Sequence, residues 1–401
     1  MFGFSREMTP FLRKILGMNW VLVLVMYALL IFGVFMIESA ARHLPMSPEK
    51  LTEFGSAGAY FAWMQKNWIV IGSVAYFGAA LIDYRWIRWL GIPLYAVSLG
   101  VMLMAMQADD DVHRLTIAGL SFQPAQLGVT SGIVMIAWLM HDLPKLHPFL
   151  GNPFVRIAII GVVSAVPFLM VMKMGDMGSA LVWIPVVIVA LLVAGIPFRF
   201  LSFIAFISAG VLPILYFVIL PLVSERGPDR IDLWLRMVEG QEVDIQGDGY
   251  APHNVSMAVG KAGWKGVGWK ATAREGSLHD KKFIPHLTAH NDFIFAVIAE
   301  ELGFRGALLL LGGFALLLIQ GLFIGFYSRD VSGRLIVCMV VALLFAHIYE
   351  NIGMCVLLMP ITGIPLPLIS YSGTFVVICM FLLGLVQSVW VHRHRGRLEE
   401  A

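Results

Sequence analysis

The stretch "GFRGALLLLGGFALLLIQGLFIGFY", residues 303–327, decides which class of protein this chain belongs to. It contains a single charged residue, Arg305. A helix needs about 20 predominantly apolar residues to cross the hydrocarbon core of a bilayer. The stretch therefore predicts a membrane-spanning helix, and the rest of the chain is interpreted from that starting point.

The composition extends this conclusion to the whole chain. Of 401 residues, 59% are hydrophobic and 13% are charged, whereas an ordinary soluble domain has roughly 25% charged residues. The net charge of +2 is small and its cations are scattered, which excludes a nucleic-acid partner. Cys338, Cys355 and Cys379 lie within apolar runs without CxxC or His-rich spacing, so neither a disulfide framework nor a metal site is indicated.

Apolar runs of spanning length recur along the sequence. The expected spans are residues 19–41, 67–82, 87–106, 124–140, 154–172, 178–196, 200–223, 303–327, 335–358 and 373–391. The first run is too long for the apolar region of a signal peptide, so it predicts a retained helix. The sequence therefore predicts an all-α polytopic membrane protein with about ten transmembrane helices, organised as a single domain over residues 1–401.

The positions of the cations predict the orientation. With a cytoplasmic N-terminus, every short inner loop holds a cation: Arg6, Arg13, Lys14, Arg85, Arg88, Lys145, Arg156, Arg199, Arg329, Arg334, Arg393, Arg395 and Arg397 are then inside. The acidic hairpin 108–114, the turn 173–178 and the long segment 224–291 are then outside. This asymmetry satisfies the positive-inside rule and predicts that both termini are cytoplasmic.

The long segment 224–291, between the seventh and eighth spans, is expected to be an ordered extracytoplasmic loop. It carries apolar anchors such as Trp234 and Trp264, and its cations include Arg230, Lys261 and Lys265. A basic, Gly-rich, Trp-bearing surface at a membrane boundary suits a lipid-linked anion such as a pyrophosphate. The alternative is a solvated loop that touches ordinary anionic headgroups.

Three carboxylates occur in "AHNDFIFAVIAEELGFRG", residues 289–306. Asp292 lies where the long loop re-enters the membrane and is a candidate general base, although a helix N-cap is the alternative. Glu301 has Arg305 one turn later, which predicts a structural i to i+4 ion pair. Glu300 has no such partner, and its role stays open.

Two further polar sites need an explanation in so apolar a chain. Asp176 lies at another outer helix start and is either a cap or a site residue. Glu350 falls in the middle of a span beside His347 and Asn351, a cluster that is expected to join helices, with a cavity lining as the alternative.

The segment "MPITGIPLPLISYSG", residues 359–373, contains three prolines between the last two spans. Proline at this density prevents a continuous helix, and non-helical backbone at membrane depth is tolerated only inside protein or beside a water-filled cavity. The segment should wall a cavity that opens outward. Residues 120–126, "LSFQPAQ", could reach the same cavity with Gln123 and Gln126.

These motifs together resemble the SEDS family (shape, elongation, division and sporulation), and most closely its RodA branch. The resemblance covers nearly the full length. It is carried by "FQP" at 122–124, "GDMGSAL" at 175–181, "HNDFIFAVIAEELGFRG" at 290–306, and "NIGM" followed by "LLMPITGIPLPLISYSG" within 351–373.

The resemblance implies a peptidoglycan glycosyltransferase that polymerises lipid II on the outer face of the bacterial cytoplasmic membrane during cell elongation and shape maintenance. Asp292 would be the catalytic base, and undecaprenyl pyrophosphate would leave with inversion. Substrate contacts are expected from Asp176, Lys261, Lys265, Arg230, Gln123, Gln126, Ser370 and Tyr371. A divalent cation, Mg²⁺ or Mn²⁺, could share the pyrophosphate charge, but no spacing indicates a protein metal site.

The resemblance also implies a partner, a class B penicillin-binding protein that acts as the transpeptidase. The chain has no SxxK, SxN and KTG set of its own, so crosslinking must come from elsewhere. Membrane lipids are the remaining expected partners.

Some positions depart from the family pattern. Gln126 and Val129 stand where a Glu and a Lys are usual, His113 or Arg114 blurs an arginine position, Asn254 and Val255 replace a "QS" pair, and Ser372 replaces a glycine. Joint loss of a buried ion pair is often tolerated. Two alternatives stay open, a lipid II flippase or transporter and a non-catalytic scaffold for a penicillin-binding protein.

Overall fold

The computed structural model describes residues 10–107, 115–117, 120–214 and 226–393. Several sequence expectations fall outside these residues: the acidic hairpin 108–114 with His113 and Arg114, the end of the seventh span at 215–223, and Arg6, Arg395 and Arg397. All statements below concern the described residues.

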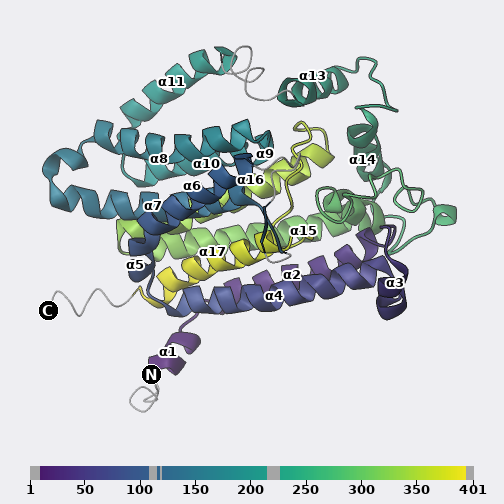
Figure 1. The fold of residues 1–401 in the computed structure, drawn as a ribbon, viewed down its shortest axis with the longest axis horizontal. Helices are drawn as coiled ribbons and strands as arrows, with labels where there is room; N and C mark the ends of the chain where they lie inside the picture. The colour runs from purple at the N-terminus through teal and green to yellow at the C-terminus, as the bar shows by residue number, and fades with distance from the viewer. Residues whose placement is uncertain (1–9, 108–114, 118–119, 215–225, 394–401) are drawn as a thin grey trace.

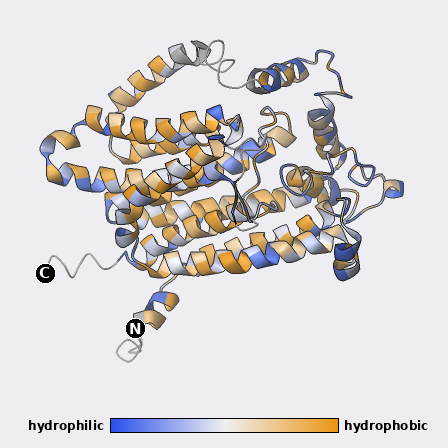
Figure 2. Ribbon diagram, in the orientation of Figure 1, coloured by the Kyte–Doolittle hydropathy of each residue, from blue (hydrophilic) through white to orange (hydrophobic). Residues whose placement is uncertain are grey.

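Ten helical segments account for the ten predicted spans. They are α2 (Trp20–Ala40), α4 (Ala57–Leu81), α6 (Gly91–Gln107), α7 (Pro124–Leu146), α8 (Pro153–Lys173), α9 with α10 (Met177–Leu181 and Trp183–Val193), α11 (Phe198–Ile214), α15 (Ile294–Tyr327), α16 (Val331–Cys355) and α17 (Thr374–Val391). Six of the described helices, α2, α7, α8, α15, α16 and α17, are individually long and apolar enough to cross a membrane. The predicted all-α polytopic fold is confirmed, and Figure 2 shows these helices as largely hydrophobic.

Shorter elements connect the spans. They are α1 (Pro10–Leu16), α3 (Pro48–Phe54), α5 (Tyr84–Ile87), η1 (Arg88–Leu90), η2 (Pro148–Gly151), α13 (Arg226–Val238), α14 (Tyr250–Lys261) and η4 (Ala273–Glu275). Strands β1 (Leu115–Ile117) and β2 (Leu120–Phe122) pair in antiparallel register, with Thr116 opposite Ser121. The two strands were not expected from the sequence, and β2 is followed by Gln123 and then by Pro124 at the start of α7.

Helices α16 and α17 form the centre of the bundle, whereas α8 lies at its edge with most of its surface unburied. Among the described helices, α4 and α17 make the most extensive contact. Gly384 permits this approach, because a Cβ there would lie 2.5 Å from the Tyr76 carbonyl oxygen. Small residues at helix crossings are the usual means of close packing where lipid removes the hydrophobic driving force.

Three span boundaries differ from the sequence expectations. The second span was expected to begin at residue 67, but α4 begins at Ala57 and carries Gln65 buried inside the bundle. The sixth span is interrupted at Val182, between α9 and α10. The eighth was expected to begin at residue 303; α15 begins at Ile294 and is broken at Gly303.

Residues 226–292 cover one end of the bundle, here called the loop face, at the right of Figure 1; α1 and the C-terminal end of α17 lie on the opposite side. Trp234 Nε1 donates to the Leu357 carbonyl oxygen at 2.9 Å. At the other end of the loop, the backbone N–H groups of Val267 and Gly268 donate to the carbonyl oxygens of Glu300 and Glu301 at 2.9 and 3.0 Å. A side-chain bond to Leu357, just after α16, and backbone bonds to α15 therefore hold the segment against the bundle.

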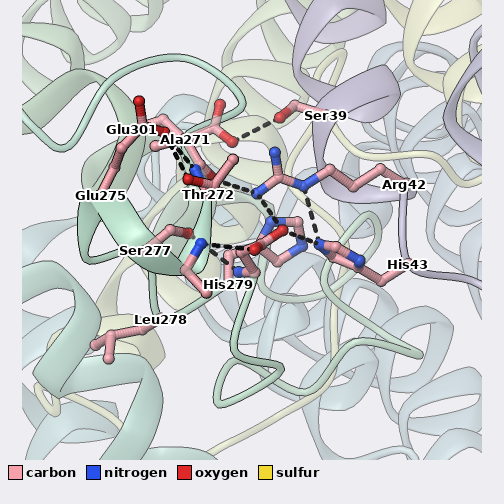
Figure 3. A network of polar contacts seen from close by, with 12 residues as sticks. Ser39, Arg42, His43, Ala271, Thr272, Glu275, Ser277, Leu278, His279 and Glu301 are labelled. Carbon is pink, nitrogen blue, oxygen red and sulfur yellow. Dashed lines mark hydrogen bonds and ion pairs between the residues drawn. The ribbon is translucent and has the colours of Figure 1, made fainter.

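A polar network, shown in Figure 3, clamps residues 271–280 of the loop against the ends of α2 and α15. Arg42 donates to the Ala271 carbonyl oxygen at 2.8 Å and lies 3.6 Å from the Asp280 carboxylate. Buried Glu300 accepts hydrogen bonds from the backbone N–H groups of Leu278 and His279. Glu300, whose role the sequence left open, therefore holds the loop.

The predicted Glu301–Arg305 ion pair is wrong. Glu301 instead accepts a hydrogen bond from the Ser39 hydroxyl at 2.5 Å, and the Arg305 side chain is exposed. The reason is Gly303, whose φ of 70° and ψ of −168° interrupt the helix between the two residues. Residues 301 and 305 are then no longer one regular turn apart, so the i to i+4 geometry is lost.

Replacement of Gly303 by alanine should destabilise the protein strongly. The backbone conformation at Gly303 is accessible essentially only to glycine and costs other residues about 1–3 kcal/mol, and a Cβ would also lie 2.3 Å from the Gly266 nitrogen. We expect Gly303→Ala to lower the midpoint of thermal unfolding in detergent. Gly100→Ala in α6 is the control, because no atom lies within 4 Å of a Cβ there; equal melting of the two variants would contradict the assignment.

Acid should weaken the loop clamp through His279. Burial lowers the pKa of His279 from 6.5 to about 3. The folded-state pKa lies below the unfolded one, so the stabilisation is complete above about pH 6.5 and is lost as the pH falls toward 3. At pH 5 the loss is about 2 kcal/mol relative to pH 7.5.

We expect His279→Gln to melt with a smaller difference between pH 7.5 and pH 5 than the wild type. The control is His253→Gln, in the half-buried part of α14. If the His279 variant keeps the full wild-type pH dependence, another group is responsible.

Candidate active site

Asp292 is presented by a tight turn that immediately precedes α15. The Thr288 carbonyl oxygen accepts hydrogen bonds from the backbone N–H groups of Asn291, Asp292 and Phe293 at 3.1, 2.9 and 3.2 Å. Phe293 is the N-cap residue of α15 and makes no side-chain cap bond. Phe293, and not Asp292, is therefore the N-cap residue of α15, and the half-buried Asp292 side chain lines a pocket.

That pocket has a volume of about 430 Å³ and lies at the loop face. Its walls come from four parts of the chain that are distant in sequence: α4 (Met64, Trp68), the residue before α7 (Gln123), the turn 287–292, and the Pro-rich segment and α17 start (363–374). The predicted cavity walled by the Pro-rich segment is thus present at the loop face, and Gln123, Tyr371 and Asp292 line it together.

Asn351 of α16 joins the two non-helical walls. Its Nδ2 donates to the Asp292 carbonyl oxygen at 2.8 Å and to the Ile364 carbonyl oxygen at 2.7 Å. Asn351 is fully buried, so both bonds form away from water, where an unmade bond would cost most. One carboxamide therefore fixes the backbone of the acid and the backbone of the Pro-rich segment relative to the central helix.

Ser370 and Tyr371 reinforce the same junction. The Ser370 hydroxyl accepts from the Leu366 N–H at 2.8 Å and donates to the Asn291 carbonyl oxygen at 2.5 Å. The Tyr371 N–H donates to the His290 carbonyl oxygen at 3.0 Å. Ser370 is fully buried, so the structure places it in the frame of the pocket, whereas Tyr371 lines the pocket itself.

Glycine is required where the Pro-rich segment approaches the acid. Gly363 has a φ of 75°, in the left-handed region, and a Cβ there would lie 3.7 Å from Asp292 Oδ2. The absence of a side chain keeps the space beside the carboxylate open.

Asp176 contacts the pocket indirectly, through Gln123. Its Oδ1 accepts from the Ser179 N–H at 2.9 Å, which caps α9, and its Oδ2 accepts from Gln123 Nε2 at 3.2 Å. Asp176 is therefore a helix cap that also orients a glutamine lining the pocket.

Gln126, which stands where the family usually has a Glu, makes contacts to side chains of other helices. Gln126 Nε2 lies 3.2 Å from His347 Nε2 and 3.4 Å from the Ser179 hydroxyl, and Val129 is fully buried. His347 also contacts the Leu343 carbonyl oxygen of its own helix through Nδ1 at 2.9 Å. The polar cluster on α16 thus joins α7 to α16, as expected for interhelical structure.

Three buried polar atoms around the pocket have no hydrogen-bond partner among the described residues. They are His290 Nδ1, Asn291 Oδ1 and Ser372 Oγ, and all three residues line the same pocket as Asp292. Burial lowers the pKa of His290 to about 4, so its ring is neutral at physiological pH. Buried polar groups are nearly always paired with protein or ordered water, so these three atoms leave hydrogen-bonding capacity unused in the pocket wall.

The predicted cations are not gathered in this pocket. Arg230 donates to the Ile361 carbonyl oxygen at 3.3 Å and lines a separate pocket between α13 and the Pro-rich segment. Lys261 and Lys265 are exposed on the loop face. No lysine or arginine is among the residues that line the Asp292 pocket.

Sequence reasoning missed Trp68 and His290 as pocket residues. Trp68 lies one residue inside the run expected as the second span, and nothing in the pattern indicates that α4 packs beside the Pro-rich segment. His290 directly precedes the polar turn that was singled out for Asp292. Its ring lies between Phe61 and Tyr371, with centroid distances of 4.9 and 5.6 Å.

Comparison with known proteins gives one family. The model described as "Cell cycle protein", for FtsW, RodA and SpoVE, matches residues 19–395. Peptidoglycan glycosyltransferase MrdB of Escherichia coli K12 is 28% identical over 379 residues, which cover 93% of each chain. Probable peptidoglycan glycosyltransferase FtsW of Geobacter metallireducens is 28% identical over 384 residues, covering 94% of this chain and 96% of that protein.

Solved structures show the same fold. A chain of a peptidoglycan synthase complex, solved in work on the coordination of polymerization and crosslinking, aligns with a TM-score of 0.73 at 22% identity and covers 94% of this chain and 99% of its own. Rod shape determining protein RodA of Thermus thermophilus aligns with a TM-score of 0.63 at 22% identity, covering 94% and 98%. With the family model spanning nearly its whole length, the chain belongs to the FtsW/RodA/SpoVE family of multi-pass membrane proteins.

Proposed function

We propose that this protein is a peptidoglycan glycosyltransferase that polymerises lipid II into glycan strands for cell elongation and shape maintenance. The observation that carries the proposal is the Asp292 pocket. One carboxylate shares it with three polar atoms that lack partners among the described residues, an arrangement suited to a ligand rich in hydroxyl and amide groups. The names of the relatives support the same activity.

In the proposed reaction Asp292 acts as general base. Its carboxylate takes the proton of the acceptor sugar's 4-hydroxyl, and the oxygen attacks the anomeric carbon of the growing chain. The bond to undecaprenyl pyrophosphate breaks with inversion, and the pyrophosphate carries the departing charge. Gly363 leaves room beside Asp292 Oδ2 for the acceptor, while Trp68 and Tyr371 offer aromatic surface to the sugar rings.

The cations of the loop face would act on the pyrophosphate from outside the pocket. Lys261 and Lys265 are exposed there, where they can attract an anionic headgroup before it reaches Asp292, and Arg230 lies in the neighbouring pocket. The described residues bring together no group of three or more His, Cys, Asp or Glu side chains. A Mg²⁺ or Mn²⁺ ion at the pyrophosphate would therefore be held mainly by the substrate's own oxygens.

The proposal sets the protein in the bacterial cytoplasmic membrane, with both termini cytoplasmic and the loop face outside. Residues 1–401 form one membrane domain with 224–291 as its outer loop. The partner would be a class B penicillin-binding protein that crosslinks the strands, in keeping with the structural likeness to a peptidoglycan synthase complex. A lipid II flippase and a scaffold for that transpeptidase are the competing functions.

Loss of the Asp292 charge should abolish polymerisation. General base catalysis contributes typically 10²- to 10⁴-fold to a rate, so we expect Asp292→Asn to lower strand formation at least about 100-fold. The measurement is the rate of glycan formation from lipid II by the purified protein together with its transpeptidase. The control is Asp232→Asn, an exposed carboxylate paired with Arg236 on α13, which should retain activity.

The competing functions give different outcomes in this assay. Equal activity of wild type and Asp292→Asn would remove Asp292 as the base. No strand formation by the wild type, with lipid II movement across vesicles intact, would favour a flippase. The absence of both activities, with transpeptidase binding retained, would favour a scaffold.

Asn351 is expected to act on the reaction through the position of Asp292. Asn351→Leu removes both bonds to the pocket walls, and a displacement of about 1 Å can cost about 100-fold in rate. We expect a fall of about 10- to 100-fold in activity per folded molecule. Asn19→Leu is the matched control, since Asn19 is also buried and bonded but caps α2 far from the pocket. If both variants lose activity only in proportion to folded protein, Asn351 has no positioning role.

A further inference from the structure

An apolar crevice runs along the lipid-facing junction of α2 and α15, two helices that pack against each other. Its volume is about 720 Å³, which is within the range of roughly 300–1,000 Å³ typical of ligand sites. Val25 and Phe32 line it from α2, and Leu309, Gly312 and Leu316 line it from α15. It is separate from the Asp292 pocket and has no part in the proposed reaction.

Arg305 is the one charged residue that lines this crevice. Its side chain is exposed, and among the described residues its guanidinium makes no hydrogen bond or ion pair. Glu301, the acid nearest in sequence, is buried on the other side of the Gly303 break and bonded to Ser39. A cation near the end of a transmembrane helix attracts anionic lipid headgroups, and the described residues supply no acid to pair with Arg305.

The depth of Arg305 matches the level of lipid headgroups on the loop side. Trp264 packs on Phe304, with ring centroids 5.5 Å apart, and Trp269 packs on Phe35 at 6.4 Å. Tryptophan at a helix end marks the boundary between headgroups and hydrocarbon. Arg305 is next to Phe304, so its guanidinium can reach that boundary.

The length of the crevice matches one leaflet. From Arg305 to Leu316 the helix rises about 16 Å at 1.5 Å per residue, and half of the hydrocarbon core is about 15 Å. The crevice therefore begins at the headgroup level with a cation and continues with apolar walls to the middle of the membrane. Gly312 keeps it open, because no atom lies within 4 Å of the position that its Cβ would occupy.

We propose that the α2–α15 crevice binds one anionic phospholipid of the leaflet on the loop side. Arg305 holds the headgroup phosphate through its fork of N–H donors, and an acyl chain fills the apolar groove as far as Leu316. A phospholipid matches this site because it joins an anionic headgroup to an acyl chain about as long as the groove. A neighbouring transmembrane helix would need a broad face, and its backbone brings no charge to match Arg305.

Native mass spectrometry of the full chain tests the site. The protein is reconstituted with equimolar phosphatidylglycerol and phosphatidylcholine of identical acyl chains, and the lipids retained on release are counted. We expect the wild type to retain phosphatidylglycerol preferentially, and Arg305→Gln to lower that retention about tenfold, as expected when a charge-assisted hydrogen bond is lost. Lys66→Gln is the matched control, an exposed cation on the loop-side half of α4 that does not line the crevice.

A second variant distinguishes the contribution of the headgroup to binding from that of the acyl chain. Gly312→Leu fills the groove without a clash, so it should lower retention of both lipids and leave the ratio between them unchanged. Equal retention of the two lipids by the wild type, or equal loss in Arg305→Gln and Lys66→Gln, would overturn the proposal. So would unchanged lipid retention in Arg305→Gln together with loss of a bound partner protein, because a protein helix would then be the occupant.

Discussion

The pair of hydrogen bonds from the Asn351 carboxamide is the interaction on which the arrangement of the Asp292 pocket depends. Non-helical backbone at membrane depth is tolerated only when its polar groups are satisfied by protein or water, and two such segments, the turn before α15 and the Pro-rich segment, meet here. Asn351 binds one carbonyl of each, at Asp292 and at Ile364. Asn351 is carried by α16, in the buried centre of the bundle. The position of Asp292 is therefore set by the core of the fold and not by the loop alone.

The long segment of the loop face is likewise held in place by hydrogen bonds to the helix bundle. Its long segment is attached to helix ends by backbone bonds near Glu300 and Glu301, by Trp234 on the Pro-rich segment, and by the clamp around Arg42 and Asp280. Two of the three carboxylates in the run 289–306 serve this attachment, and only Asp292 lines the pocket. Each of the three acids therefore has its own place in the structure: Glu300 binds the loop backbone, Glu301 binds Ser39, and Asp292 lines the pocket.

Much of this could be predicted from the sequence. The ten spans follow from apolar length, because the bilayer imposes that length on every crossing, and the Pro-rich segment was expected to wall a cavity. Other features could not be predicted. The contact between Trp68 and the Pro-rich segment depends on which helices are neighbours, the partner of Glu301 depends on a glycine break that hydropathy does not show, and the separation of Lys261 and Lys265 from Asp292 depends on the path of the loop.

The polar contacts that build the pocket are almost all neutral. Asn351, Ser370, Gln123 and Gln126 are donors or acceptors without charge, and Asp292 and Asp176 are the carboxylates that line the pocket or orient its lining. Dissolved salt screens charges but leaves neutral hydrogen bonds nearly unchanged. The architecture around the acid should therefore hold from dilute buffer to high ionic strength, and any salt sensitivity of turnover would report on the charge of the substrate, not on the integrity of its binding site.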